Sequence, residues 1–460
     1  MVFTKRWTPS PNNERNVCEG IRVLEVELSQ PLPDVPAINV RTGQRYQQAI
    51  SLVRLHHQPL GVVELCLGED GLNATDYAHQ VWRSLRPAIN QYLLQHGLME
   101  VTGLEADGLR DVNVLGNGQT PGPSLTDVPP ASVVVATRDR TASLARCLRS
   151  LLSMDYPEYE IVVVDNAPSS KMTADFIRQE YGDSPRVRYF LESQPGLGAA
   201  HNRGLREVEA PIVAFTDDDV LVDRHWLQEL VKGFSNGDNV ACVTGMIFPM
   251  ELETQSQVWT EEYWGLGKGF TRRVFDLQEN RPKVPLYPLT AGVFGSGANM
   301  AFRTSVLRQF GGFDAALGAG TIARGGDDLA AFFQVVSSGY KLVYQPAAII
   351  YHQHRRDYDG LRRQAFGYGV GLTAYVTKSL MDRPRLLFSL VSRAPYAFSF
   401  IFSLRSTKPA GFPRELKSLE RRGMICGPFA YLRSRWQCRK FKQGLGTVKQ
   451  PIGVRGVTHE

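Results

Sequence analysis

The chain has 460 residues, of which 43% are hydrophobic and 21% are charged. This composition excludes a disordered or fibrous protein, and the length exceeds one ordinary hydrophobic core, so we expect two or three domains. The six cysteines are scattered without a Cys-x-x-Cys pair, which argues against a zinc site or a disulfide framework and favours a reducing compartment. The first residues lack the apolar run of a signal peptide.

The net charge of +6 hides a strong asymmetry along the chain. Residues 351–460 contain 21 Lys+Arg and 6 Asp+Glu, a surplus of +15, so the remaining residues sum to −9. A basic carboxy-terminal quarter predicts an anionic partner for that quarter: membrane lipid, phosphorylated lipid or nucleic acid.

Residues 1–102 are predicted to form a small α/β domain after a loose polar start. Its expected strands are 21–28 and 61–67, and a helical pattern covers 76–94. This domain offers no recognisable chemistry. Residues 103–130 are rich in Gly, Asp, Asn and Pro and are predicted to be a linker.

Strands and helices then alternate. The predicted strands are 132–137, 159–164, 187–191 and 212–215; the predicted helices are 141–152, 172–181 and one that opens in the glycine-rich turn at 194–204. Repeated βα units of this length predict a parallel sheet with right-handed crossovers. Ligands bind such sheets at the carboxyl ends of the strands, where Asp165 and a run of three aspartates are expected to lie.

That run is Thr216-Asp217-Asp218-Asp219, which follows the apolar strand 212–215. Three adjacent carboxylates repel one another, so they favour water, a helix amino terminus or a cation. A hard divalent ion held together with substrate phosphates is one interpretation. Capping of the helix expected from about residue 224 is the other, and this stretch alone leaves both open.

Five motifs occur in a fixed order between Ser132 and Tyr375. They are Val164-Asp165-Asn166, Gly198-Ala-Ala-His-Asn202-Arg-Gly204, Thr216-Asp217-Asp218-Asp219, Gly325-Gly326-Asp327-Asp328-Leu329 and Tyr344-Gln-Pro-Ala-Ala-Ile-Ile-Tyr-His352. In this order they resemble the nucleotide-sugar-binding half of family 2 glycosyltransferases, which have the GT-A fold. The chain departs from the family pattern at His201, where Arg is more usual, and at Asp327, where Glu is common.

The resemblance implies a role for each matching position. Asp165 would contact the nucleotide base, and Asp219 with Asp217 or His352 would bind Mg²⁺ or Mn²⁺; His354 is an alternative to His352. The other expected donor contacts are Thr137, Arg138, Asn202, Arg203, Asp217 and Asp218. For Arg138, Arg203 and Arg324, contact with phosphate and a plain surface position remain alternatives.

The reaction also needs a general base for the acceptor hydroxyl. Asp328 is the candidate, with Asp327 as a ligating or orienting partner. Asp328 could also cap the helix expected at 329–337, and both roles can hold at once. A single base without a second carboxylate nucleophile implies direct displacement with inversion at the anomeric carbon.

We therefore expect an α/β protein with a mostly parallel, Rossmann-like GT-A sheet at 131–378 and a helical basic region at 379–460. The expected partners are a nucleotide-sugar donor and a saccharide or lipid-linked acceptor, and nucleic acid is not expected. A nucleotidyltransferase is one alternative, although Ala136-Thr-Arg-Asp-Arg140 lacks the glycines usual after the first strand of that class. A non-catalytic sugar- or lipid-binding scaffold is another.

The stretch Leu386–Leu404 is the candidate membrane segment, but Arg393 and Pro395 interrupt it. It fits an interfacial segment better than a spanning one, with an ordinary core helix pair as the alternative. We expect a protein of the cytoplasm that is peripheral to the inner membrane. The Gln-x-x-Arg-Trp motif of processive relatives is absent, because Leu432 stands where Gln would be, so single addition is expected.

Overall fold

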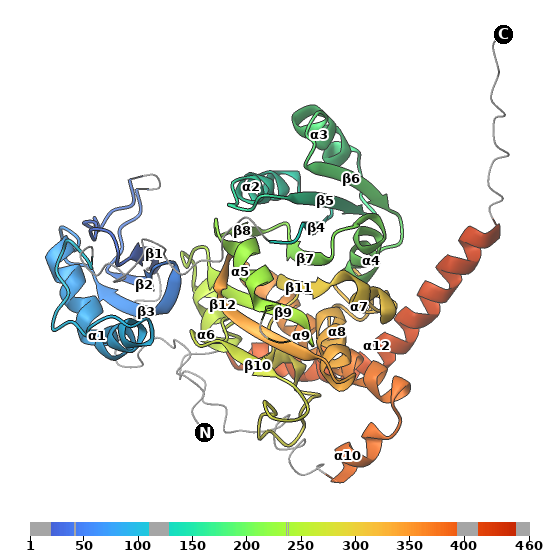
Figure 1. Ribbon diagram of the computed structural model, residues 1–460. Helices are drawn as coiled ribbons and strands as arrows, with labels where there is room; N and C mark the ends of the chain where they lie inside the picture. Colours follow the sequence, from blue (N-terminus) through green and yellow to red (C-terminus); the bar gives the residue numbers. More distant parts are fainter. Residues whose placement is uncertain are drawn as a thin grey trace.

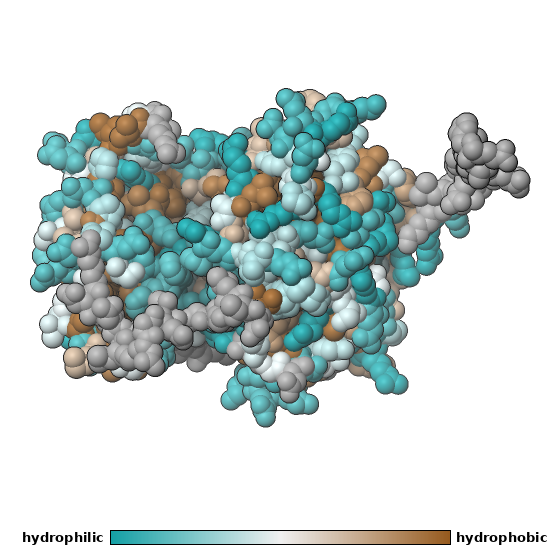
Figure 2. All heavy atoms as spheres, turned by 45° about the horizontal axis from the view of Figure 1, so that its top comes forward, coloured by the Kyte–Doolittle hydropathy of each residue, from teal (hydrophilic) through white to brown (hydrophobic). Residues whose placement is uncertain are grey.

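The computed structural model describes residues 20–40, 43–109, 128–235, 237, 239–392 and 413–447. Within these ranges a small amino-terminal unit lies beside a larger unit with a nine-stranded sheet (Figure 1). The face shown in Figure 2 is largely hydrophilic, with hydrophobic residues in separate groups. Most of the predicted linker at 103–130 lies outside the described residues.

The amino-terminal unit is a three-stranded sheet covered by one helix. It comprises β1 (Arg22–Glu27), β2 (Gln48–Leu55), β3 (Gln58–Cys66) and α1 (Ala74–Gln95). The central strand β2 pairs parallel with β1 and antiparallel with β3. The sequence predicted the outer strands and the helix but missed β2, whose residues after Gln48 are all buried and therefore do not alternate.

The first half of the large sheet confirms the predicted parallel βα units. It comprises β4 (Ala131–Thr137), α2 (Thr141–Leu152), β5 (Tyr159–Asn166), α3 (Met172–Tyr181), β6 (Val187–Glu192), α4 (Leu197–Glu207) and β7 (Ile212–Asp217). The strands lie in the order β7-β4-β5-β6, and all three pairings are parallel. Their carboxyl ends, which carry Thr137, Asp165 and Asp217, therefore meet at one edge.

The second half is mixed. It comprises β8 (Val220–Val222), α5 (Trp226–Gly233), β9 (Val240–Pro249), α6 (Gln255–Tyr263), β10 (Arg273–Phe275), the 3-10 turn Ala291–Val293, β11 (Asn299–Arg303), α7 (Thr304–Gln309), α8 (Asp327–Ser337) and β12 (Lys341–His352). Six of the nine strands run in one direction; β8, β10 and β11 oppose them. In the β12–β8 pairing His352 is opposite Val220, so the end of β12 lies next to the aspartates.

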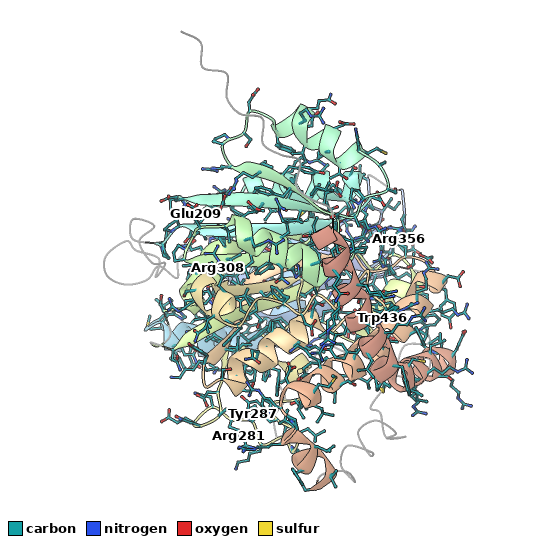
Figure 3. The ribbon with its side chains drawn as sticks, turned by 90° about the vertical axis from the view of Figure 1, so that its right-hand side faces the viewer. Glu209, Arg281, Tyr287, Arg308, Arg356 and Trp436 are labelled. Atoms are coloured by element: carbon teal, nitrogen blue, oxygen red, sulfur yellow. The ribbon has the colours of Figure 1, made fainter. Side chains whose placement is uncertain are left out.

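Three helices complete the described chain: α9 (Tyr358–Asp382), α10 (Leu386–Ser392) and α12 (Arg414–Thr447). Figure 3 looks onto α12, which packs along α9. A Cβ atom at Gly423 would collide with the Phe366 carbonyl, and one at Gly427 with the Thr373 hydroxyl. The two glycines therefore permit the close approach that fixes which face of α12 points outward.

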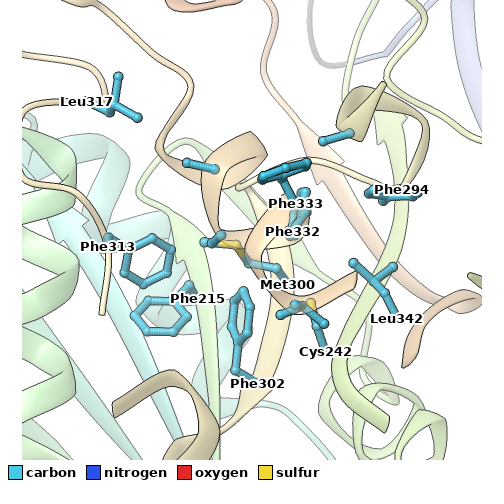
Figure 4. Close-up of a cluster of buried hydrophobic side chains, with 14 of the residues drawn as sticks. Phe215, Cys242, Phe294, Met300, Phe302, Phe313, Leu317, Phe332, Phe333 and Leu342 are labelled. Atoms are coloured by element: carbon cyan, nitrogen blue, oxygen red, sulfur yellow. The ribbon is translucent and has the colours of Figure 1, made fainter. Parts of the chain in front are cut away.

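The aspartate strand is anchored by an aromatic cluster on one side of the sheet (Figure 4). Phe215 of β7 contacts Phe313 and Phe302, with ring centroids 5.1 Å and 6.1 Å apart. All three rings are buried, and burying a Phe side chain contributes roughly 1.5–3 kcal/mol. This packing holds rigid the strand end that carries the carboxylates.

Among the described residues, no helix is both long enough and apolar enough to cross a bilayer. The stretch Leu386–Leu404 is described only through Ser392, and α10 there exposes Leu387, Phe388 and Val391. Arg393 and Pro395 lie outside the described residues.

The two units are joined by a buried cation. Arg54 of β2 is 3% exposed, and its Nη1 donates to Glu25 Oε1 at 2.7 Å and to Asp223 Oδ2 at 2.6 Å. Asp223 belongs to the large unit, and the Tyr351 hydroxyl of β12 also contacts Glu25. Because burial makes an unpaired charge costly, this network ties the small unit to the sheet edge near the aspartates.

We expect Arg54→Met to lower the free energy of unfolding by about 3–5 kcal/mol, because it leaves two carboxylates without their shared cation. Urea denaturation followed by circular dichroism measures this loss. Arg188→Met is the control, because Arg188 and Glu160 form a much more exposed pair, whose loss should cost less than about 1 kcal/mol. Equal losses for the two variants would show that the buried pair does not hold the units together.

Candidate active site

Two of the three aspartates at the end of β7 share a site with a histidine. One ligand atom each from Asp217, Asp219 and His352 lie within 4.8 Å of one another. Burial, reinforced by repulsion from Asp219 and Asp218, raises the pKa of Asp217 well above its usual value. Carboxylate oxygens together with an imidazole nitrogen suit Mn²⁺ or Mg²⁺, so this donor set fits the expected ion.

A chain of hydrogen bonds behind His352 fixes its tautomer. His352 Nδ1 lies 3.3 Å from His354 Nδ1, and His354 Nε2 lies 3.0 Å from Glu261 Oε2. With a neutral His354 that donates from Nε2 to the glutamate, Nδ1 of His354 accepts and His352 donates from its Nδ1. Burial lowers the pKa of His352 to about 4, so the ring is neutral. Its Nε2 lone pair faces Asp219 Oδ1 at 3.5 Å, and His354 stands behind it.

The middle aspartate is held by the neighbouring strand. Thr137 Oγ1 donates to Asp218 Oδ2 at 2.7 Å, and Arg140 Nη1 donates to Asp218 Oδ1 at 2.6 Å and to Asp219 Oδ2 at 3.0 Å. Asp218 is buried and braces β7 against β4. The expected donor contacts of Thr137 and Asp218 stay predictions. Arg140 was missed, although it lies in the polar turn after the first strand of the sheet, on the ligand side.

Asp165 lies near the carboxyl end of β5, and one of its carboxylate oxygens has no partner among the described residues. The Tyr189 hydroxyl donates to its Oδ2 at 3.0 Å, while its Oδ1 is buried without a partner among the described residues. Burial raises the pKa of Asp165. The next residue, Asn166, accepts from the Gly196 amide at 2.8 Å and so ties β5 to the glycine-rich turn. Sequence reasoning missed Tyr189, because its contact with Asp165 depends on strand pairing.

Two carboxylates lie in the first turn of α8. Its amino-terminal cap is Gly326, with φ of 86°, so the idea that Asp328 caps a helix beginning at Leu329 is wrong. Asp328 accepts from the Gly297 amide at 2.9 Å and from the Leu329 amide at 2.8 Å, which orients its carboxylate. Burial, and then repulsion from Asp328, raises the pKa of Asp327 to about 7. Asp328 is the more exposed member of the pair.

Three predicted donor contacts are engaged elsewhere or lie in solvent. The Asn202 amide donates to the Phe313 carbonyl and accepts from the Phe313 amide, both at 2.8 Å, so it holds the loop before α8. Arg203 pairs with Glu207 at 3.0 Å on the same helix, and Arg138 is exposed. Their donor contacts also stay predictions.

Comparison with known proteins matches residues 129–367 to the model of the family described as glycosyltransferase like family 2. A pre-mycofactocin glycosyltransferase of Mycobacterium tuberculosis is 28% identical over 271 residues, which are 59% of this chain and 52% of that protein. A glucosyl-dolichyl phosphate glucuronosyltransferase of Haloferax volcanii is 23% identical over 254 residues, 52% of this chain and 74% of that protein.

Among solved structures, a mannosyltransferase from Pyrobaculum calidifontis in complex with GDP-Man and Mn²⁺ is 19% identical. The structural alignment covers 71% of this chain and 83% of the mannosyltransferase chain, with a TM-score of 0.43. The sequence match to the mycobacterial protein spans about half of that protein's length. The family model, in contrast, matches more than half of this chain, and its matched range contains β4 to β12 with all the carboxylates of the candidate site. The chain belongs to glycosyltransferase family 2 and has the GT-A fold.

Proposed function

We propose that the protein is a metal-dependent, inverting glycosyltransferase that moves a sugar from a nucleotide-sugar donor to an acceptor hydroxyl. The observation that carries this proposal is the ligand set of Asp217, Asp219 and His352 at the carboxyl edge of the sheet. The same edge carries the unpartnered oxygen of Asp165, and Asp328 is oriented on α8 by two backbone amides.

On the donor side, Asp165 Oδ1 is a buried acceptor that fits an N–H group of the nucleotide base. Asp217, Asp219 and His352 would hold Mn²⁺ or Mg²⁺, and the imidazole favours Mn²⁺. Such an ion, when bound, neutralises the charge that develops on the departing diphosphate. Arg140 already neutralises part of the carboxylate charge and holds Asp218 and Asp219 in place.

On the acceptor side, Asp328 takes the proton of the acceptor hydroxyl. The oxygen bonds to the anomeric carbon as the bond from that carbon to the diphosphate oxygen breaks, and the nucleoside diphosphate leaves. A single displacement of this kind inverts the anomeric centre. The amides of Gly297 and Leu329 hold the Asp328 carboxylate still, while each oxygen keeps a further lone pair for the proton.

The acceptor is proposed to be a saccharide or a lipid-linked saccharide. The name of the Haloferax relative describes a sugar carried on dolichyl phosphate, which supports the lipid-linked class. We infer single addition from the missing Gln-x-x-Arg-Trp motif.

The deciding experiment incubates the full chain with a panel of nucleotide-sugars and Mn²⁺, with and without chelator, and identifies the released product. Release of nucleoside diphosphate that stops with chelator supports the proposal. Release of pyrophosphate would identify a nucleotidyltransferase instead. Metal-independent turnover would overturn the metal site, and no turnover with any donor would favour a non-catalytic scaffold.

The hydrogen bonds from His352 through His354 to Glu261 predict a large effect for one variant and a smaller effect for another. His352→Ala removes a ligand and should nearly abolish Mn²⁺ binding, measured by electron paramagnetic resonance with nucleoside diphosphate present. Glu261→Gln keeps all three proposed ligands but disturbs the tautomers of His354 and His352. Mutation of such outer partners typically weakens metal affinity by about 10–100-fold. His79→Ala on the exposed side of α1 is the control and should change nothing. Equal effects of all three variants would refute the ligand assignment.

Asp328→Asn should reduce kcat by about 10²–10⁴-fold, the usual contribution of a general base, because an amide cannot take the hydroxyl proton. Donor affinity should hardly change, since the base does not contact the nucleotide. The matched control is Asp359→Asn, which changes an exposed carboxylate in the first turn of α9. Loss of donor affinity with an unchanged kcat at saturation would make Asp328 a binding residue.

A further inference from the structure

The solvent-facing side of α12 carries a stripe of large apolar residues, which we call the α12 stripe: Ile425, Phe429, Leu432 and Trp436. They are 69%, 74%, 48% and 55% exposed. Their spacing of four, three and four residues places them on one face of the helix. Across the described chain sixteen large apolar side chains are exposed, and eight of these follow residue 380. Apolar exposure is therefore concentrated at this end of the molecule.

The helix cannot rotate to hide the stripe. On its opposite face Gly423 and Gly427 lie against α9, and the Tyr431 hydroxyl donates to Asp314 Oδ2 at 2.8 Å. Cys438 also contacts the Ala315 carbonyl, so both halves of the helix are fixed to the large unit. In Figure 3 Trp436 lies on the helix that faces the viewer. The stripe is thus a fixed part of the surface.

Unpaired cations flank the stripe. Residues 414–447 contain nine Lys+Arg and two Asp+Glu. The glutamates are already engaged, Glu415 with Arg362 and Glu420 with the Tyr263 hydroxyl. The exposed cations on this side are Arg422, Arg433, Arg439 and Lys440. None of them forms an ion pair with another described residue, and the Lys440 ammonium lies 3.8 Å from the centre of the Trp436 ring.

We propose that the α12 stripe and its flanking cations form a docking surface for an anionic lipid bilayer. Apolar side chains enter the boundary between headgroups and acyl chains, while Lys and Arg remain among the phosphates. Amphipathic helices at membrane surfaces combine these two features, with Trp and Phe on the apolar side. The surplus of unpaired positive charge around the stripe is complementary to anionic headgroups.

The helix that carries the stripe is also linked to the proposed active site through α9. α12 packs on α9, and Gly371 of α9 contacts Gly326, the cap of the helix that begins with Asp327 and Asp328. Docking through α12 would therefore hold the site near acceptors carried by the bilayer. This step rests on the proposed function and deepens it, whereas the docking itself does not require turnover.

The test measures co-sedimentation of the full chain with vesicles of phosphatidylcholine alone or mixed with phosphatidylglycerol. We expect binding to the mixed vesicles, weak binding to phosphatidylcholine, and a steep loss with added salt. Phe429→Ser with Trp436→Ser should weaken binding at least tenfold, because both rings lose their burial in the interface. Arg433→Glu with Arg439→Glu should weaken it by more than roughly fivefold per residue.

Matched controls lie on the amino-terminal unit. Leu94→Ser with Met99→Ser removes equally exposed apolar groups, and Arg83→Glu with Arg86→Glu makes the same charge change. Donor hydrolysis should persist in every variant, so a failure of docking is distinguishable from a failure of the proposed activity. No binding of the intact chain at low salt overturns the proposal. So do equal losses in the controls, or a self-association in sedimentation velocity that only the stripe variants abolish.

Discussion

Everything at the proposed site depends on three negative charges placed side by side at the end of a buried strand. Asp217 is the last residue of β7, and Asp218 and Asp219 form the turn that follows; Asp217 and Asp219 lie together beside His352, whereas Asp218 contacts Thr137 and Arg140. The structure stabilises the two sets differently. Asp218 is satisfied within the protein by Thr137 and Arg140, and Arg140 also donates to one oxygen of Asp219. The other ligand atoms of Asp217 and Asp219 lie beside a neutral histidine. The resulting excess charge is what a divalent cation would offset.

The same edge depends on β12 as much as on β7. This strand pairs parallel with β9 along most of its length, and its register shifts between Gln345 and Ile349. After the shift, antiparallel pairing with β8 places His352 opposite Val220, the residue after the last aspartate. A change in that shift would move every later side chain to the other face of the sheet. The register shift therefore determines whether His352 or a neighbouring side chain faces the carboxylates.

The sequence predicts local structure well where it is periodic. The helices Thr141–Leu152 and Met172–Tyr181 have the predicted bounds, and the parallel strands differ by only one or two residues at their ends. The sequence also predicts that Asp165 and Asp217 lie at the carboxyl ends of parallel strands, because each follows an apolar run that forms a strand. It cannot predict Arg140, Tyr189 or the chain from His352 to Glu261, since these partners are set by tertiary packing. Asn202 shows the reverse case, because its motif suggests a donor contact while its amide is bonded to Phe313.

The departures from the family motifs, His201 and Asp327, affect the charge of the two carboxylates at the start of α8. His201 is buried beside Asp327, 3.7 Å from its Oδ2, and burial lowers the pKa of His201 to about 3. A neutral imidazole therefore stands where the family usually has a cation, and it gives Asp327 no charge compensation. With its pKa raised to about 7, Asp327 is partly protonated near neutral pH. This protonation reduces the negative charge of the pair, and Asp328 is the more exposed member and the one that two amides orient. A neutral histidine at position 201 thus leaves Asp327 free to be protonated, which is compatible with the proposed role of Asp328 as a single general base.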